Sequence, residues 1–185
     1  MIQIEINGNK RTMNNAINEI TVAEFEQLCV ILNGNDEDVF DRYLRVFAVL
    51  GLSDEEIDII TPNEFIDLTK TFTDEDWECT EFKQTIEVDG IIYTAYSGSE
   101  FKLSVRDLAK IEKYIKQDNQ KYMGEMLAII YKNLALDRMV HYDDSHIKSK
   151  AELFRAKVTA DVILPYVNLI LKDIVTKLKG NDLTK

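Results

Sequence analysis

The chain begins with a regular alternation of apolar and polar side chains. Ile2, Ile4 and Ile6 are each separated by one polar residue, and a period of two is typical of a strand with one buried face. Asn7 and Gly8 follow, and because both residue types tolerate positive φ, they predict a tight turn. With a return strand around residues 10–14, the pattern predicts a β-hairpin.

After the hairpin, apolar residues recur three and four positions apart, which is typical of helices with one buried side. Three predicted helices begin with a capping box, in which Ser or Thr precedes Glu by three residues. These boxes are Thr21 with Glu24, Ser53 with Glu56, and Thr61 with Glu64. The last of these helices is expected to run to about Phe72.

A further helix is predicted at 36–50, where three acidic residues suit the positive end of the helix dipole. Its apolar positions predict one broad buried stripe, made of Val39, Phe40, Tyr43, Leu44, Phe47 and Leu50.

The second half of the chain repeats this order. Strands at 82–88 and 91–96 flank Asp89 and Gly90, which predict another hairpin. Helices are expected from Ser104 and at 120–136, followed by a polar loop at 137–149. A long last helix is predicted at 150–179, with a kink at Pro165, because proline removes a backbone hydrogen bond and crowds the preceding turn.

Matching blocks in the two halves indicate a duplicated module. Ile4–Gly8 resembles Ile86–Gly90, and the helix start at Thr21 resembles that at Ser104. We therefore predict a helix-dominated α+β protein with a first module at 1–72, an acidic linker at 73–80 and a second module at 81–185.

The charge of the chain is distributed unevenly. The net charge is −11, which argues against nucleic acid as a direct partner, because binding to phosphates needs a basic surface. Residues 1–80 hold 18 acidic and five basic side chains, whereas residues 81–185 hold 15 acidic and 17 basic ones. The acidic first half is either a solvated face or a docking surface for a basic partner.

Cysteine content and hydropathy indicate an intracellular chain without a membrane segment. Cys29 and Cys79 are the only cysteines, and they lack the spacing of a metal or redox motif, so reduced thiols are expected. The most apolar run, at 162–171, is about half of the roughly 20 residues that span a bilayer.

Motifs of catalysis, cofactor binding and metal binding are absent from the sequence. His141 and His146 flank two aspartates, but they are five positions apart, whereas two histidines on one helical face need a spacing of four. The acidic runs at 36–38 and 54–56 lack the glycine and spacing of a calcium loop. We expect no enzyme, no cofactor and no metal, although carboxylates that folding brings together leave an enzyme of unfamiliar type as an alternative.

Several motifs of the second half occur together in one known group of proteins. They are Asp89-Gly90, Ser104-Val105-Arg106-Asp107-Leu108, Leu127-Ala128-Ile129-Ile130-Tyr131, Tyr142 and Ala151-Glu152-Leu153-Phe154. In this pattern, residues 84–175 resemble a family of small structural and tail-assembly proteins of tailed bacteriophages, including the crAss-like phages of the gut. The resemblance implies a non-enzymatic protein that is found in the virion or in the host cytoplasm, and that binds portal, tail or head components.

Two alternatives and one candidate surface follow from these patterns. The chain could be a cargo protein delivered to the host, or an acidic host-directed inhibitor that mimics DNA. Apolar residues surround the predicted last helix, and such a helix is either central to the core or shared with another subunit, which includes a homo-oligomer. The candidates for this core or interface role are Val162, Ile163, Tyr166, Leu169 and Ile170.

Overall fold

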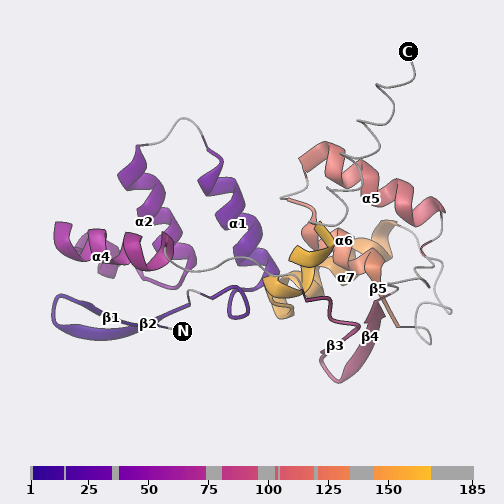
Figure 1. Cartoon of the computed structure of the whole chain (residues 1–185), viewed down its shortest axis with the longest axis horizontal. Coiled ribbons are helices and arrows are strands. Elements are labelled where there is room, and N and C mark those ends of the chain that lie inside the picture. The colour runs from indigo at the N-terminus through magenta and orange to yellow at the C-terminus, as the bar shows by residue number, and fades with distance from the viewer. Residues whose placement is uncertain are drawn as a thin grey trace, which may run out of the picture.

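The computed structural model describes residues 2–14, 16–34, 38–73, 81–95, 103, 105–118, 121–133 and 144–167. The elements of the first half are β1 (Ile2–Ile6), β2 (Asn9–Met13), α1 (Val22–Leu32), α2 (Val39–Val49), α3 (Asp54–Asp58) and α4 (Pro62–Thr73). Those of the second half are β3 (Thr85–Val88), β4 (Ile91–Ala95), α5 (Val105–Asp118), α6 (Met123–Ile130), β5 (Tyr131–Lys132) and α7 (Asp144–Lys157). The predicted helix-dominated α+β class is confirmed (Figure 1).

Both predicted hairpins form, and their turns have the expected backbone. β1 pairs antiparallel with β2, and Asn7 and Gly8 have φ values of 48° and 78°. Asp89 and Gly90 repeat these values at 51° and 78° between β3 and β4. Because both central residues have positive φ, the turns match the twist of the strands that they join.

The three predicted capping boxes are also present. At the start of α1, the backbone N–H of Glu24 donates to Thr21 Oγ1 at 3.2 Å, and the backbone N–H of Thr21 donates to Glu24 Oε2 at 2.7 Å. Equivalent pairs occur at Ser53 with Glu56 and at Thr61 with Glu64. Each pair satisfies helix-end donors that have no partner inside the helix.

The helix predicted at 120–136 is wrong at its end. α6 stops at Ile130, and Tyr131 adopts extended backbone with φ −94° and ψ 118°. β5 then pairs with β4 through Ala95 and Tyr131, so the second sheet has three strands in the order β3-β4-β5. Burial of the Tyr131 side chain in the core accompanies this change of direction.

The single helix predicted at 150–179 is also wrong. α7 begins at Asp144, inside the predicted polar loop, and ends at Lys157. The next residues pair with the first half of the chain: Val22 N–H donates to Val158 C=O and Ala160 N–H donates to Ile20 C=O, both at 2.8 Å. These long-range hydrogen bonds interrupt the helix before residues 160–167 become helical again. A break at 158–159 therefore divides the predicted helix, while the kink at Pro165 stays a prediction.

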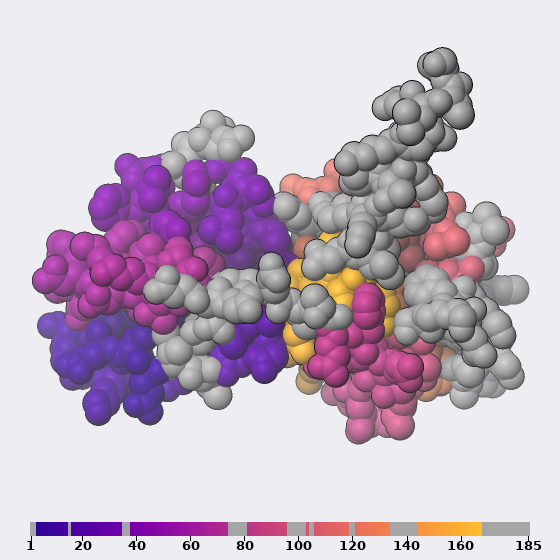
Figure 2. All heavy atoms as spheres, viewed as in Figure 1, coloured from indigo at the N-terminus to yellow at the C-terminus, as the bar shows by residue number. Residues whose placement is uncertain are grey.

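Two hydrophobic clusters form the core, and α1 belongs to both. Val22 is buried with α6, α7 and residues 160–167, whereas Leu28 and Ile31 are buried with β1, α2 and α4. Phe25 packs against both clusters. In Figure 2 the residues of the two halves gather on opposite sides of the molecule. Most of the predicted linker lies outside the described residues, and the duplication of the module stays a prediction.

Candidate functional site

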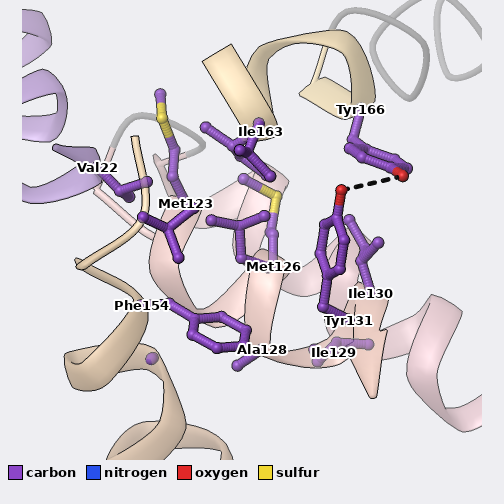
Figure 3. Close-up of a cluster of buried hydrophobic side chains, with 14 of the residues drawn as sticks. Val22, Met123, Met126, Ala128, Ile129, Ile130, Tyr131, Phe154, Ile163 and Tyr166 are labelled. Carbon is purple, nitrogen blue, oxygen red and sulfur yellow. Dashed lines mark hydrogen bonds between the residues drawn. The ribbon is translucent and has the colours of Figure 1, made fainter. Parts of the chain in front are cut away.

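The structure places three of the five candidate interface residues in the core. Val162, Ile163 and Tyr166 are buried in the cluster that contains α6 and α7, and Figure 3 shows Ile163 and Tyr166 close to Met126 and Tyr131. Leu169 and Ile170 lie outside the described residues. Of the two roles that the sequence left open, the structure assigns the core role to the three described residues.

Beside them, two tyrosine hydroxyls lie against one backbone carbonyl. The hydroxyl oxygens of Tyr131 and Tyr166 are 3.5 Å apart (Figure 3). They lie at 2.5 and 3.3 Å, respectively, from the carbonyl oxygen of Lys83. Burial raises the pKa of Tyr131 well above its ordinary value, and the hydrogen bond with Tyr166 raises it further. Tyr131 therefore keeps its proton at neutral pH, and the cluster fastens residue 83 to the helical segment 160–167.

A second polar cluster surrounds Arg155, where α1, α6 and α7 meet. Its Nε donates to Glu26 Oε2 at 2.7 Å and its Nη1 donates to Glu152 Oε1 at 2.7 Å. Its Nη2 pairs with Glu125 and also reaches the carbonyl of Lys121 at 3.3 Å. One guanidinium thus joins carboxylates from three helices, which its fork of five donors allows.

Gly124 makes this close arrangement possible. Its backbone N–H donates to Glu26 Oε1 at 3.0 Å, and a Cβ at this position would lie 2.8 Å from Arg155 Cγ. Because real Cβ atoms do not approach other atoms so closely, any larger residue would displace the arginine. The glycine therefore lets the arginine side chain pass against α6.

The pKa values of the cluster follow from burial and pairing. Burial raises the pKa of Glu26, and the hydrogen bond from Arg155 lowers it by less. Burial alone would lower the pKa of Arg155, but Glu26 and Glu125 together raise it above the ordinary value. The arginine therefore stays charged among its carboxylate partners. Its ion pairs form a structural clamp that holds α1, α6 and α7 together.

A cavity of about 360 Å³ opens next to this clamp. It is lined by Ala23, Glu26, Gln27, Val30, Ile31, Arg45, Lys121 and Arg155. Cations at its wall already contact carboxylates, since Arg155 pairs with Glu26 and Lys121 pairs with Asp118 at 3.3 Å. An anionic ligand would therefore have to compete with these ion pairs, so the cavity has little of the character of an anion site.

The part of the chain that the structure describes holds no group of three His, Cys, Asp or Glu side chains that could bind a metal ion. His146 lies in α7, whereas His141 is outside the described residues. The acidic residues of 54–56 form the first turn of α3, and Asp38 caps α2 by accepting from Phe40 N–H at 2.7 Å. These acids act at helix N-termini, as their sequence position predicts.

The predicted buried stripe of α2 is wrong at its first two positions. Val39 and Phe40 are 59% and 61% exposed, while Val46 and Phe47 are buried. The ring of Phe40 stacks on that of Phe65 in α4 at a centroid distance of 4.8 Å, and Ile66, next to Phe65, is 49% exposed. We call Val39, Phe40 and Ile66 the α2–α4 patch. Adjacent residues of a helix point about 100° apart. The predicted stripe was therefore too wide at the start of α2 for one neighbouring helix to cover both Val39 and Phe40.

Within the described residues, none of the helices combines the length and the apolar character needed to cross a membrane. Comparison with protein-family models, with curated proteins and with solved structures gave no match to this chain.

Proposed function

We propose that this chain is a non-enzymatic protein of a tailed bacteriophage, either part of the virion or active in tail assembly, that binds other phage proteins. The observation that carries the binding role is the α2–α4 patch, with three exposed apolar side chains on two neighbouring helices. Large exposed apolar side chains with polar residues around them are typical of protein–protein contact sites.

The non-enzymatic part of the proposal is supported by the partners of the buried charged groups. Arg155 joins three helices, Lys83 pairs with Asp161, and Lys132 pairs with Asp107 at 2.8 Å. Each of these pairs connects separate segments of the chain, and such pairing is what buried charges need to remain in a folded core.

The phage assignment rests on the resemblance of residues 84–175, and the roles of the matched motifs support it. The block Leu127–Tyr131 is fully buried, Asp89 and Gly90 form the turn of the second hairpin, and Phe154 contacts Tyr93 edge to face at 5.0 Å. Residues that build the core and its turns are the ones that proteins of the same fold are expected to share.

Peptide mass spectrometry of gradient-purified phage particles, beside the lysate from which they came, tests this proposal. Peptides in stoichiometric amount in the particles are expected for a virion protein that contacts portal, tail or head components. Peptides confined to the lysate are expected for a tail-assembly factor. Synthesis of the protein in cells that carry no phage genome would overturn the proposal.

The charge of the first half favours one further candidate, an acidic inhibitor of a host protein. Residues 1–80 carry 18 acidic side chains against five basic ones. This function predicts binding to a basic host protein that weakens steeply with salt. Affinity capture from infected cells at low and high salt separates it from the assembly role, in which the captured proteins are phage proteins.

A further inference from the structure

The α2–α4 patch lies in an acidic setting. Residues 38–42 and 64–70, which carry the patch, contain four carboxylates, Asp38, Asp41, Glu64 and Asp67, against two cations. Three of these acids, Asp38, Asp41 and Asp67, are exposed. An occupant of this surface should therefore combine an apolar face with positive charge, because like charges would repel it.

The chain itself contains a segment with this chemistry. In residues 168–179, Leu171, Ile174, Val175 and Leu178 are spaced three and four positions apart, which is typical of one apolar helix face. The same segment has three lysines and one aspartate. It lies outside the described residues, and it includes Leu169 and Ile170, two of the five interface candidates from the sequence.

We infer that the α2–α4 patch of one copy of the chain binds residues 168–179 of a second copy. Phe40 would supply the aromatic anchor, because it is exposed yet its ring is held in place by stacking on Phe65. Exposed aromatic anchors that are already ordered lose little freedom on binding. The exposed acids at the patch would face Lys172, Lys177 and Lys179.

This contact joins two different surfaces of the chain, so each surface can be damaged in a separate variant. A copy with a damaged patch still has an intact C-terminal segment, and a copy with a damaged segment still has an intact patch. Two such variants should each self-associate much more weakly than the wild type, but they should pair with each other when they are mixed. The inference rests on the proposed binding role and names self-association as one form of it.

The experiment uses the full-length chain in sedimentation velocity at several concentrations. Phe40→Asp and Ile174→Asp should each raise the dissociation constant of self-association about tenfold or more, the effect typical of a central interface residue. Their equimolar mixture should form a 1:1 complex. Ile92→Asp is the matched control, because Ile92 is 58% exposed on β4, and it should associate like the wild type.

A second variant distinguishes loss of the contact from loss of the fold. Lys172→Glu combined with Lys179→Glu changes charge without adding a polar group to the apolar face, and it should also prevent self-association. Circular dichroism on each variant checks that the fold is retained. Raising NaCl from about 0.1 M to about 1 M shortens the Debye length from roughly 10 to 3 Å and should weaken the contact.

Three results would overturn the inference: a wild-type chain that stays monomeric, a variant mixture that fails to pair, or an equal effect of Ile92→Asp. The test needs only purified protein, so it fails independently of the phage assignment. A strictly monomeric chain that is present in purified particles would remove the self-docking contact and leave the proposed function in place.

Discussion

Arg155 illustrates how much one side chain contributes where three helices meet. Replacing it by methionine keeps the length of the side chain but leaves Glu26 and Glu125 without their cation, and their side chains are only 12% and 10% exposed. We expect Arg155→Met to lower the free energy of unfolding by about 3–5 kcal/mol, as for other buried ion pairs that lose one partner. Urea denaturation measures this loss.

The ion pair between Arg155 and Glu152 serves as a control, because the Glu152 side chain is 75% exposed. Glu152→Gln removes one carboxylate in the same helix, and because surface ion pairs contribute little, it should cost less than about 1 kcal/mol. If Glu152→Gln and Arg155→Met destabilised the protein equally, burial of the other two carboxylates would not be the cause.

Cys29 should react slowly with thiol reagents in the folded protein. Burial raises the pKa of this thiol to about 11 from 9.0, with smaller contributions from the charges of Glu26 and Asp118. The thiolate is the reacting form, so at pH 8 its population falls about 100-fold. In a Cys79→Ser background, Cys29 should react with iodoacetamide at least that much faster after unfolding in urea, and the folded rate should increase tenfold per pH unit. A folded rate close to the unfolded one would contradict the partly buried environment of the thiol.

At the scale of single elements, the start of α4 links a helix cap to the first hairpin. Glu64 accepts from both Thr61 N–H at 2.8 Å and Thr61 Oγ1 at 2.7 Å, and its other oxygen accepts from Asn7 N–H at 2.7 Å. These hydrogen bonds, led by that from the Thr61 side chain, lower the pKa of Glu64 below its ordinary 4.5. A lowered pKa in the fold means that the carboxylate stabilises the protein above pH 4.5, and that this contribution is lost as the pH falls through the lowered value.

Glu64→Gln should therefore destabilise the protein at pH 7, and the difference from wild type should shrink as the pH falls below about 4.5. Urea denaturation at pH 7, 5, 4 and 3 measures the trend. Asp58→Asn, an exposed change at the end of α3, serves as the control and should give a smaller difference at pH 7. A difference between Glu64→Gln and wild type that does not depend on pH would show that the carboxylate charge is not what the cap requires.

Elements set by neighbouring residues were predictable from the sequence, and those set by distant residues were not. The turns at Asn7 and Asp89 and the three capping boxes depend on residues at most three positions apart, so the pattern contains all of their determinants. β5 depends instead on β4, and the break after α7 depends on residues 20–22. No local pattern around Tyr131 or Val158 contains these partners. Predictions from propensity and periodicity therefore extended both helices too far.

The same distinction applies to the candidate sites. An apolar pattern around residues 162–166 indicated a core or an interface, but only the packing of α6 and α7 could assign the core role. Arg155 had no recognisable motif, because its partners Glu26 and Glu125 come from helices far apart in the sequence. The exposure of Phe40 likewise could not be predicted without the position of α4.

For the whole molecule, α1 decides whether the two halves behave as one unit. Its residue Val22 is buried with the second half, Leu28 is buried with the first, and Phe25 contacts both clusters. A helix shared in this way loses contacts on both sides when either cluster unfolds. Because the cost of separating the halves includes exposing the shared face of α1, we expect one cooperative transition rather than two.

The two clusters offer matched changes that test this expectation. Leu28→Ala in the first cluster and Ile163→Ala in the second each remove a buried aliphatic side chain, and each should cost about 2–5 kcal/mol. In urea, both variants should shift the same single transition, as measured by circular dichroism and by tyrosine fluorescence. Two separate transitions, with Leu28→Ala lowering only one and Ile163→Ala only the other, would instead establish independent modules at 1–72 and 81–185 and make α1 a connection that contributes little stability to either half.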